Sequence, residues 1–374
     1  MTKKKYAMLG CGMMGQEHLR NIALLPEIEV AAIYEPDDAM RAKSHALAPG
    51  ATLAPSIDAL LALPELDALV ITSPNHCHTA QLETIFAARK IPVLVEKPVA
   101  THLSEVARLR TLAHTMAAPV WTAMEYRYMP AITRFVHEAH SAQATGSAVM
   151  LSIREHRYPF LHKVGDWNRF NRNTGGTLVE KCCHFFDLMR LVMGDNPVRL
   201  FASGGHNHNH LDERYGGEQP DILDNAFVVL DFPGQRRALL DLCMFAEGSR
   251  YQEEISLVGP VGKLECKVPG PSRFWPGEQR GEQPVAQLTV SPRNGAPPSV
   301  LEVPVDPALL AAGDHNGSTF YQHQKFLDVV CGRGAVEVSL HDGIAAVVIG
   351  LAAEHSAATG AVVDLTQGPW QLAP

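Results

Sequence analysis

Short apolar runs alternate with amphipathic segments over the first 125 or so residues, and this alternation constrains the fold more than any other feature. The runs are rich in Val, Ile and Leu and end at Gly, Pro or charged residues: YAMLG, EVAAIYE, ALVITS, PVLVEK and PVWTAME. Segments with helical spacing, such as HTAQLETIFAARK, lie between them. Strands and helices that take turns indicate parallel strands joined by right-handed crossovers, and strands covered on both faces are apolar throughout. We therefore predict a doubly wound parallel sheet.

The pattern changes after about Pro130. Strand-like segments with partial alternation follow, with few helices between them, over 146–158, 198–204, 223–232, 236–245 and 252–266. This arrangement favours an antiparallel or mixed sheet. Gly and Pro crowd residues 259–304, which we interpret as short strands and loops before a helical tail. Because 374 residues exceed one ordinary core, we expect an α/β protein of two domains, 1–128 and 129–374.

Composition narrows the possible partners and surroundings. Acidic residues outnumber basic residues 40 to 32, and a net charge of −8 argues against nucleic acid or an anionic membrane as a partner. No apolar run approaches the roughly 18 residues that span a bilayer, and no signal-peptide core follows MTKKKY. The seven cysteines are irregularly spaced and do not resemble a disulfide framework. We expect a location in the reducing cytoplasm.

The segment MLGCGMMG places Gly10, Gly12 and Gly15 in the spacing G-x-G-x-x-G. The first glycine permits a tight turn, the second lets a pyrophosphate approach the backbone, and the third lets helix pack on strand. Phosphates then lie at the helix N-terminus, beside Met13 and Met14, where free N–H groups favour negative charge. The motif alone is weak, but here it follows the first strand and opens a helix. This context predicts dinucleotide binding.

The acid that ends the second strand, Glu35, lies 20 residues after Gly15. A carboxylate there can accept hydrogen bonds from both ribose hydroxyls and would repel a 2′-phosphate. Pro36 follows it, and the first downstream base is Arg41, which we expect to point away on a helix. The sequence therefore favours NAD over NADP, with a merely solvated Glu35 as the alternative.

Two further strand ends should lie at the same edge, where such sheets bind their ligands. The third strand ends in TSPNHCH, residues 72–78, and the fourth in EKP, residues 96–98. We expect the first segment to contact the cofactor through Ser73, Pro74, Asn75 and His78. Lys97 would lie over the nicotinamide end.

These segments resemble the glucose–fructose oxidoreductase/inositol dehydrogenase family, Gfo/Idh/MocA. GCGMMG resembles its dinucleotide loop, TSPNHCH its T-P-N-x-x-H segment and VEKP its E-K-P signature. DWNRFNRNTGGTLVEKCCHFFDL is similar to its W-R…G-G-x-L-x-D-x-G-x-H-x-x-D pattern, so the resemblance covers essentially the whole chain. It implies a Rossmann domain joined to an α/β domain on an open, largely antiparallel sheet. It also implies NAD(P)-dependent oxidation or reduction of a hydroxyl on a sugar, cyclitol or related polyol.

The resemblance assigns roles by position. Lys97 matches the catalytic lysine and Glu96 a cofactor contact, while His184 matches the catalytic histidine. Glu180 stands where the family usually has Asp, and Asp187 matches the acid that follows the histidine.

Two other positions depart from the family pattern and put the substrate in doubt. Cys182 stands where the family commonly has Gly, and Asn168 follows the Trp where Arg is usual. On the substrate side we expect Arg127, Trp167, Asn168 and Asp187, with Trp167 in the core and Asp187 paired to Arg190 as the structural alternatives.

The chemistry needs a group that removes the hydroxyl proton as the carbonyl forms. We expect His184 to take this proton, since the ordinary histidine pKa is roughly 6.5. Lys97 would position and polarise the oxygen; the two roles could also be exchanged. At spacings i, i+4 and i+7, Glu180, His184 and Asp187 share one helix face, so Glu180 would hold His184 or a substrate hydroxyl.

A metal is the other interpretation of the Cys and His clusters. On a helix Cys182 lies well off the face of Glu180 and His184, and adjacent Cys182–Cys183 lacks redox spacing. HNHNHL, residues 206–211, is more typical of a polar surface loop than of a metal site. We expect no required metal.

Three functions remain open from the sequence. The leading one is an NAD-dependent dehydrogenase of a sugar, sugar derivative or cyclitol. The second uses NAD transiently in a redox-neutral cleavage, elimination or isomerisation, and the third is an NAD-binding sensor without activity. An open sheet with one uncovered face also predicts a homodimer or homotetramer formed through the C-terminal sheet.

Overall fold

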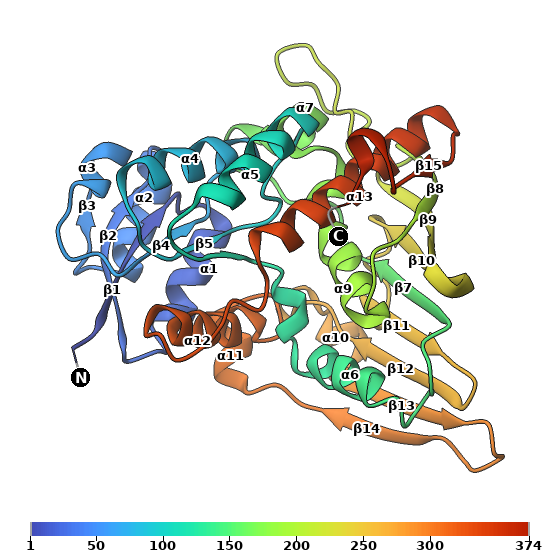
Figure 1. Ribbon diagram of the computed structural model, residues 1–374. Coiled ribbons are helices and arrows are strands. Elements are labelled where there is room, and N and C mark those ends of the chain that lie inside the picture. The colour runs from blue at the N-terminus through green and yellow to red at the C-terminus, as the bar shows by residue number, and fades with distance from the viewer. Residues whose placement is uncertain (1, 373–374) are drawn as a thin grey trace.

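A computed structural model describes residues 2–372, which fold around two sheets (Figure 1). The first sheet has six parallel strands in the order β3-β2-β1-β4-β5-β6. Its strands are β1 (Lys4–Leu9), β2 (Ile28–Tyr34), β3 (Thr52–Leu53), β4 (Ala68–Ile71), β5 (Val93–Val95) and β6 (Val120–Thr122). Every residue of β4, β5 and β6 is buried, as expected for parallel strands covered on both faces. The predicted doubly wound sheet is confirmed, with the short β3 as an additional strand.

The strand order reverses between β1 and β4, which places the loops after these strands side by side. The helices of this half are α1 (Met13–Ile22), α2 (Asp38–Leu47), α3 (Ile57–Leu61), α4 (His78–Ala88) and α5 (Leu103–Thr115). Side chains of Asp37 and Ser56 cap α2 and α3, whereas Gly12 gives α1 no side-chain cap. The first N–H groups of α1 therefore remain available at the carboxyl edge of the sheet.

The second sheet has nine strands in the order β14-β13-β12-β11-β7-β10-β9-β8-β15. Its strands are β7 (Met150–His156), β8 (Arg199–Gly205), β9 (Asn225–Phe232), β10 (Arg236–Cys243), β11 (Glu253–Val258), β12 (Gly262–Val268), β13 (Ala286–Pro292), β14 (Ser299–Val303) and β15 (Val363–Asp364). Neighbouring strands are antiparallel except β7 and β10. The predicted open, largely antiparallel sheet is confirmed.

The single strand expected over 252–266 is wrong, because this segment forms the hairpin of β11 and β12. A turn at 259–261 joins the two strands, and the Gly259 amide bonds to the Gly262 carbonyl at 3.0 Å. A Cβ at Gly259 would lie 2.2 Å from the Thr145 carbonyl oxygen, so only glycine fits the close approach there.

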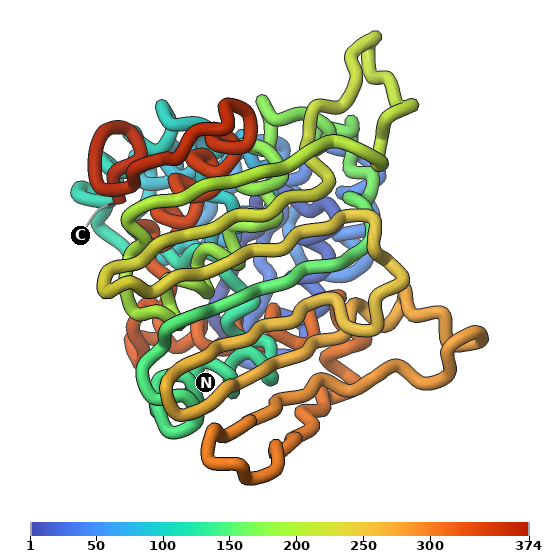
Figure 2. Tube along the Cα trace, turned by 90° about the vertical axis from the view of Figure 1, so that its right-hand side faces the viewer, coloured from blue at the N-terminus to red at the C-terminus, as the bar shows by residue number. Residues whose placement is uncertain are grey.

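Helices cover one face of the second sheet and leave the other open. The covering helices include α6 (Pro130–Ser141), α9 (Cys183–Met193) and α13 (Leu340–Thr359). No helix crosses in front of the central strands on the open face (Figure 2). Side chains of β9 alternate between buried and exposed, with Phe227 57% and Val229 41% exposed.

The chain returns to the first domain near its end. Helices α11 (Pro307–Ala312) and α12 (Ser318–Val330) both contact α1, and α13 contacts α5. The boundary between residues 128 and 129 stays a prediction; it falls between the short helix η2 (Glu125–Tyr128) and α6.

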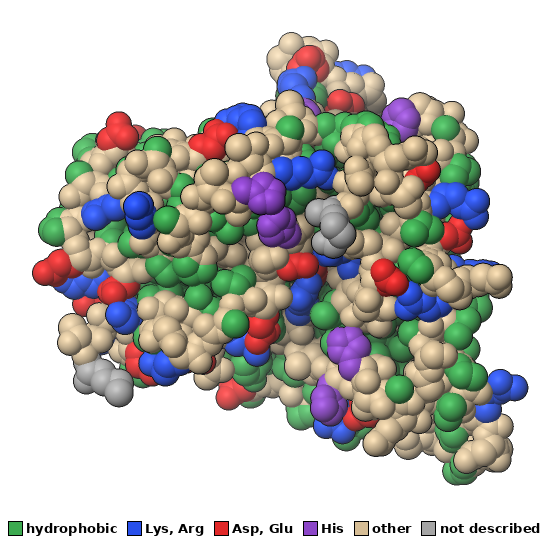
Figure 3. Space-filling view, viewed as in Figure 1, with side chains coloured by type: hydrophobic (Ala, Val, Ile, Leu, Met, Phe, Trp, Pro, Cys, Tyr) green, Lys and Arg blue, Asp and Glu red, His purple; other side chains and the backbone are tan. Residues whose placement is uncertain are grey.

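No helix in 2–372 is long and apolar enough to cross a membrane. Basic and acidic side chains are interspersed on the face in Figure 3.

Candidate active site

The glycine loop leaves space beside the start of α1. Gly10 has φ +77°, and a Cβ there would lie 2.6 Å from the Cα of Ser73. A Cβ on Gly15 would lie 2.7 Å from Thr72 Oγ1, whereas a Cβ on Gly12 would meet nothing within 4 Å. The three glycines thus serve the tight turn, the open approach and the close packing that their spacing indicates.

The end of α1 that opens onto this space carries two predicted cofactor contacts. Met13 is exposed and Met14 is half-buried. On the neighbouring loop, Asn75 is 5% exposed and its Nδ2 has no hydrogen-bond partner within the described chain. An open cradle beside free N–H groups and an unpaired amide donor fit a dinucleotide.

Glu35 ties the end of β2 to the glycine loop. Its Oε2 accepts a 2.5 Å hydrogen bond from the Cys11 amide, and its Oε1 accepts one of 2.8 Å from Asp37. Each carboxylate oxygen keeps a further lone pair for a ribose hydroxyl. Arg41 donates to the backbone carbonyl of Glu35 at 3.1 Å and pairs with Asp38. Arg41 therefore does not point away as expected: its guanidinium lies at the end of β2, where it bonds to the backbone and to Asp38.

His78 links the loop after β4 to the loop after β5, both of which are predicted to contact the cofactor. It is fully buried, and its ring nitrogens lie 2.7 Å from the Pro98 carbonyl and 2.9 Å from the Ser73 carbonyl. Pro74 begins the short helix η1 (Asn75–Cys77) in the same loop. His78 therefore holds the backbone of these loops from inside the protein, whereas Ser73 and Pro74 lie in the loop after β4 itself.

Glu96 and Lys97 point in different directions. Glu96 is 4% exposed, and its Oε1 lies 2.9 Å from His18 Nε2, inside the protein. The Lys97 Nζ donates to the Glu180 carbonyl at 3.1 Å. Burial favours the neutral amine, but the neighbouring Cys183 sulfur and the carboxylates of Glu96 and Glu180 oppose it, and the pKa of Lys97 is raised. Lys97 therefore carries a positive charge at neutral pH.

His184 presents a neutral imidazole. Its ring stacks on Tyr126 with centroids 4.2 Å apart and planes 10° from parallel, and it is 2% exposed. Burial and then the charges of Lys97 and Lys181 hold the pKa of His184 well below its usual value. Its Nδ1 has no hydrogen-bond partner in residues 2–372. A neutral histidine beside a charged lysine can accept a proton while the lysine polarises an oxygen.

The single helix expected through Glu180, His184 and Asp187 is wrong. The helix α8 (Thr177–Glu180) ends before α9 begins, and the Cys182 amide bonds to the Thr177 carbonyl, five residues back, at 3.4 Å. This wider turn changes the register between the two helices. The Oε1 of Glu180 bonds to Lys163 Nζ at 3.0 Å, and its Oε2 has no partner among the described residues. No hydrogen bond joins the described side chains of Glu180 and His184.

Asp187 pairs with Arg127. The alternative prediction that Asp187 pairs with Arg190 is therefore wrong. Two hydrogen bonds of 2.5 Å join the Asp187 carboxylate to the Arg127 guanidinium. Asp187 is fully buried and the Arg127 side chain is 11% exposed. Arg190 pairs instead with Asp342. The Arg127–Asp187 pair fastens η2 to α9, whereas contact with a substrate stays a prediction for both residues.

Trp167 and Asn168 belong to a loop that reaches the first domain. Lys163 Nζ lies 4.4 Å from the centroid of the Trp167 ring. The ring centroids of Trp167 and His76, on η1, are 6.1 Å apart. Asn168 is fully buried, and its Nδ2 donates to the Leu161 carbonyl. Trp167 is therefore placed at the junction of the two domains, while Asn168 braces the loop that carries it.

The cysteines serve as packing residues. Cys182 and Cys183 are buried and free, and burial raises the pKa of Cys183 to about 12. The histidines of HNHNHL lie in a turn after β8 and do not share a strand face.

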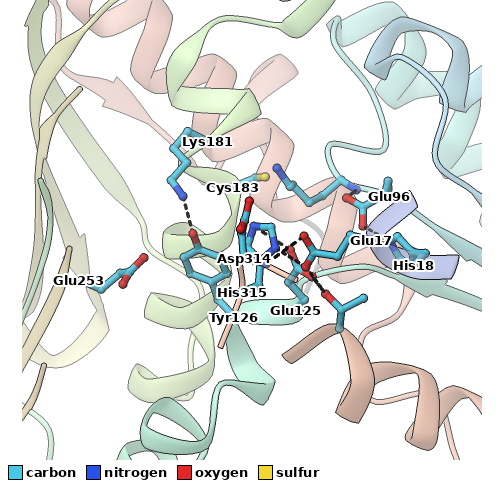
Figure 4. A network of polar contacts seen from close by, with 12 residues as sticks. Glu17, His18, Glu96, Glu125, Tyr126, Lys181, Cys183, Glu253, Asp314 and His315 are labelled. Carbon is cyan, nitrogen blue, oxygen red and sulfur yellow. Dashed lines mark hydrogen bonds and ion pairs between the residues drawn. The ribbon is translucent and has the colours of Figure 1, made fainter. Parts of the chain in front are cut away.

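Several polar residues of the same region are absent from the sequence interpretation. Lys181 Nζ contacts the Tyr126 hydroxyl at 2.5 Å and Glu155 at 2.8 Å. Glu155 lies opposite Glu253 on neighbouring strands, and burial, with the Glu155 charge, raises the pKa of Glu253 to about 8. His315 lies near Tyr126, with centroids 6.1 Å apart (Figure 4). An inward acid on an otherwise apolar strand face is the signal that could have identified Glu155 and Glu253.

The fold and the site define a two-domain oxidoreductase with a nicotinamide-dinucleotide cofactor. Residues 4–124 match the model of the oxidoreductase family NAD-binding Rossmann fold, and residues 142–365 match its C-terminal alpha/beta domain. The chain belongs to the Gfo/Idh/MocA oxidoreductase family.

Similar proteins agree with this assignment. Inositol 2-dehydrogenase 2 of Saccharopolyspora erythraea is 27% identical over 265 residues, which are 70% of this chain and 73% of that protein. An Agrobacterium radiobacter oxidoreductase, solved with NAD+, L-tartaric acid and magnesium, is 20% identical with a TM-score of 0.78 over 97% of this chain and 99% of its own. Levoglucosan dehydrogenase, solved with NADH and L-sorbose, is 17% identical with a TM-score of 0.80 over 98% and 100%. These two structures share the fold.

The Arg127–Asp187 pair allows a test of what holds the site together. Replacing Arg127 with Leu leaves the Asp187 carboxylate buried without its partner, and we expect the free energy of unfolding to fall by about 3–5 kcal/mol. Urea unfolding measures it. Arg108→Leu is the matched control, because Arg108 pairs with Glu83 on the surface of the first domain and this exposed pair should contribute about 0–1 kcal/mol. An equal loss of unfolding free energy in both variants would contradict a special structural role for the Arg127–Asp187 pair.

Proposed function

We propose that this protein is an NAD-dependent dehydrogenase that transfers hydride between nicotinamide and a hydroxyl carbon of a sugar, sugar derivative or cyclitol. The observation that carries the proposal is the pairing of a charged Lys97 with a neutral, buried His184 at the carboxyl edge of the dinucleotide-binding sheet. The inositol dehydrogenases among its relatives support this substrate class.

The residues divide the reaction between them. The nicotinamide ring, when bound, supplies the hydride acceptor. Lys97 donates a hydrogen bond to the substrate oxygen and stabilises the negative charge that develops on it. His184 accepts the hydroxyl proton during oxidation and returns it during reduction. Glu180 orients a neighbouring hydroxyl through its unpartnered Oε2.

The role of His184 gives the reaction a defined pH dependence. Protonation removes the lone pair that accepts the substrate proton, and the pKa of His184 is lowered in the folded protein. The rate of oxidation should therefore stay level from about pH 8 to pH 6.5 and fall only at lower pH. Lys97, whose pKa is raised, should keep its charge across this range. Steady-state kinetics with a panel of sugars and cyclitols measure the profile.

Single substitutions test the roles proposed for His184 and Lys97. His184→Asn and Lys97→Met should each lower turnover about 10²–10⁴-fold while NAD affinity changes little. His114→Asn, in an exposed ring contact with His341 away from the site, is the control. Near-normal turnover in both site variants would refute the assignment. Conversion of substrate without net NADH formation would instead indicate the redox-neutral cycle.

The cofactor preference follows from the end of β2. A 2′-phosphate would meet the carboxylate of Glu35, while Arg41 is engaged with the backbone and with Asp38. Glu35→Gln removes the charge and keeps an oxygen for the Cys11 amide, so kcat/KM with NADP relative to NAD should rise about tenfold, or 1.4 kcal/mol. Glu29→Gln, which removes an exposed charge at the opposite end of β2, is the control. An unchanged ratio for Glu35→Gln would contradict NAD selectivity by Glu35.

We also propose a homodimer or homotetramer formed through the open face of the second sheet, and a cytoplasmic location in which the seven cysteines stay reduced. On neighbouring strands this face exposes Phe201, Phe227 and Val229. A second copy would remove this apolar area from water. We further propose a small-molecule substrate, with neither nucleic acid nor membrane as a partner, because the net charge is −8 and basic side chains do not cluster on the face in Figure 3.

The oligomer can be tested at its centre. Phe227→Asp places a charge on the open face, and we expect light scattering after size exclusion to show monomers. Leu24→Asp changes an equally apolar exposed residue of the first domain, and it should leave the oligomer intact. A monomeric unmodified protein, or dissociation of both variants alike, would contradict the proposal.

A further inference from the structure

Lys181 is a buried lysine in the turn between α8 and α9, and the sequence assigns it no role. Its side chain is 4% exposed. The Nζ atom donates a hydrogen bond to the Tyr126 hydroxyl at 2.5 Å and pairs with Glu155 Oε1 at 2.8 Å. In Figure 4 the Lys181 side chain reaches the hydroxyl end of the Tyr126 ring. Lys181 therefore joins the segment that carries His184 to η2 and to β7, from which Tyr126 and Glu155 come.

The Tyr126 ring is the surface on which the imidazole of His184 lies. The two ring centroids are 4.2 Å apart, and the planes are 10° from parallel. Phe185 meets the same tyrosine edge-on, with centroids 5.7 Å apart. A buried tyrosine hydroxyl needs a hydrogen-bond partner, and Lys181 supplies one. This bond at one end of the ring fixes the plane that His184 contacts.

His184 lacks the hydrogen bond that commonly orients a proton-accepting histidine. In such sites a carboxylate accepts a hydrogen bond from Nδ1–H and fixes the ring. The Nδ1 of His184 has no hydrogen-bond partner in residues 2–372, and Asp187, on the same helix, is bonded to Arg127 instead. The stack on Tyr126 is therefore the contact that can hold the imidazole plane.

We propose that Lys181 is a positioning residue for the proposed reaction, because its hydrogen bond to the Tyr126 hydroxyl holds the ring that keeps His184 in place for proton transfer. Glu155 in turn holds Lys181 through their ion pair. The part that this series of contacts plays in turnover rests on the proposed function, whereas the positioning of the imidazole does not.

The charge of Lys181 also favours the neutral form of His184. Burial, and then the charges of Lys97 and Lys181, lower the pKa of His184, and His315 and Arg157 add to this effect. Losing the Lys181 charge should therefore raise the pKa of His184. Losing only the hydrogen bond to Tyr126 leaves that charge in place.

The acidic groups around the stack of Tyr126 and His184 face cations of their own or are protonated. The pairs are Glu155 with Lys181, Glu180 with Lys163, Asp187 with Arg127 and Glu125 with His315. Burial, with the Glu155 charge, raises the pKa of Glu253 to about 8. Within residues 2–372 no carboxylate forms a hydrogen bond with the imidazole, so no direct acidic contact opposes the nearby cations.

The ring current of Tyr126 gives a readout of the stack that needs no substrate. The protons of an imidazole on the face of an aromatic ring resonate upfield, so the His184 signal, assigned by comparison with His184→Asn, should lie upfield in the histidine-labelled protein. Tyr126→Phe keeps the ring and the ion pair of Lys181 but removes the hydroxyl, and we expect the upfield shift to shrink. Lys181→Met should shrink it too and raise the pH at which the signal titrates. Lys5→Met, which breaks an exposed pair with Glu65, is the control and should leave the signal unchanged.

Turnover tests whether Lys181 acts through Tyr126. Lys181→Met and Tyr126→Phe should each lower kcat about 10-fold to 100-fold, as misplacement of a reacting group does, with little change in NAD affinity. The double variant should be no slower than the slower single variant, because both changes break the same contact. The acid limb of the pH profile should move to higher pH in Lys181→Met and stay in place in Tyr126→Phe.

Two results would overturn the proposal. One is a His184 signal that stays at its original position in both variants, and the other is a double variant whose loss of kcat equals the product of the single losses. If Lys181→Met does not fold, because Glu155 loses its partner, the His184 signal of Tyr126→Phe still decides. An unmodified protein that shows the upfield signal but oxidises no sugar or cyclitol would contradict the proposed function and support the positioning contact.

Discussion

The buried ion pair between Arg127 and Asp187 is the interaction on which the arrangement of the site depends. It joins η2, at the end of the parallel sheet, to α9, which lies on the second sheet. The same two elements carry Tyr126 and His184, whose rings stack. A buried ion pair adds little net stability compared with apolar packing, but losing one partner is costly. The pair therefore serves best to fix how the two domains meet.

Burial and neighbouring charge together set the protonation states of Lys97 and His184. His184 is buried and Lys97 is half-buried. Their pKa values shift in opposite directions, because burial and then cationic neighbours lower that of the histidine, whereas acidic neighbours outweigh burial at the lysine. Desolvation favours the neutral form of each, and nearby charge decides which of them keeps its proton. A neutral histidine therefore lies near a charged lysine. These are the protonation states that the proposed oxidation of a hydroxyl needs.

The sequence predicts the parts of the site that depend on local spacing. The loops at Gly10 and Lys97 follow strands of a parallel sheet, which the alternation of apolar strands with amphipathic helices predicts. The glycines have the roles expected from their spacing. The helix through Glu180 was mispredicted because an i−5 hydrogen bond changes the register, which side-chain periodicity does not reveal. Contacts such as those of Lys181 and His315 join residues that only the tertiary fold brings together, so no local pattern marks them.

The glutamate at position 180, where the family usually has aspartate, now has a physical explanation. One carboxylate oxygen reaches Lys163, which in turn lies over Trp167 on the loop at the domain junction. An aspartate is one methylene shorter and would lose this contact or draw the loop inward. The other oxygen is buried and has no hydrogen-bond partner among residues 2–372, so it can accept a hydrogen bond. The longer side chain therefore lets one carboxylate hold this loop while its second oxygen stays available for the hydroxyl that the proposed function assigns to it.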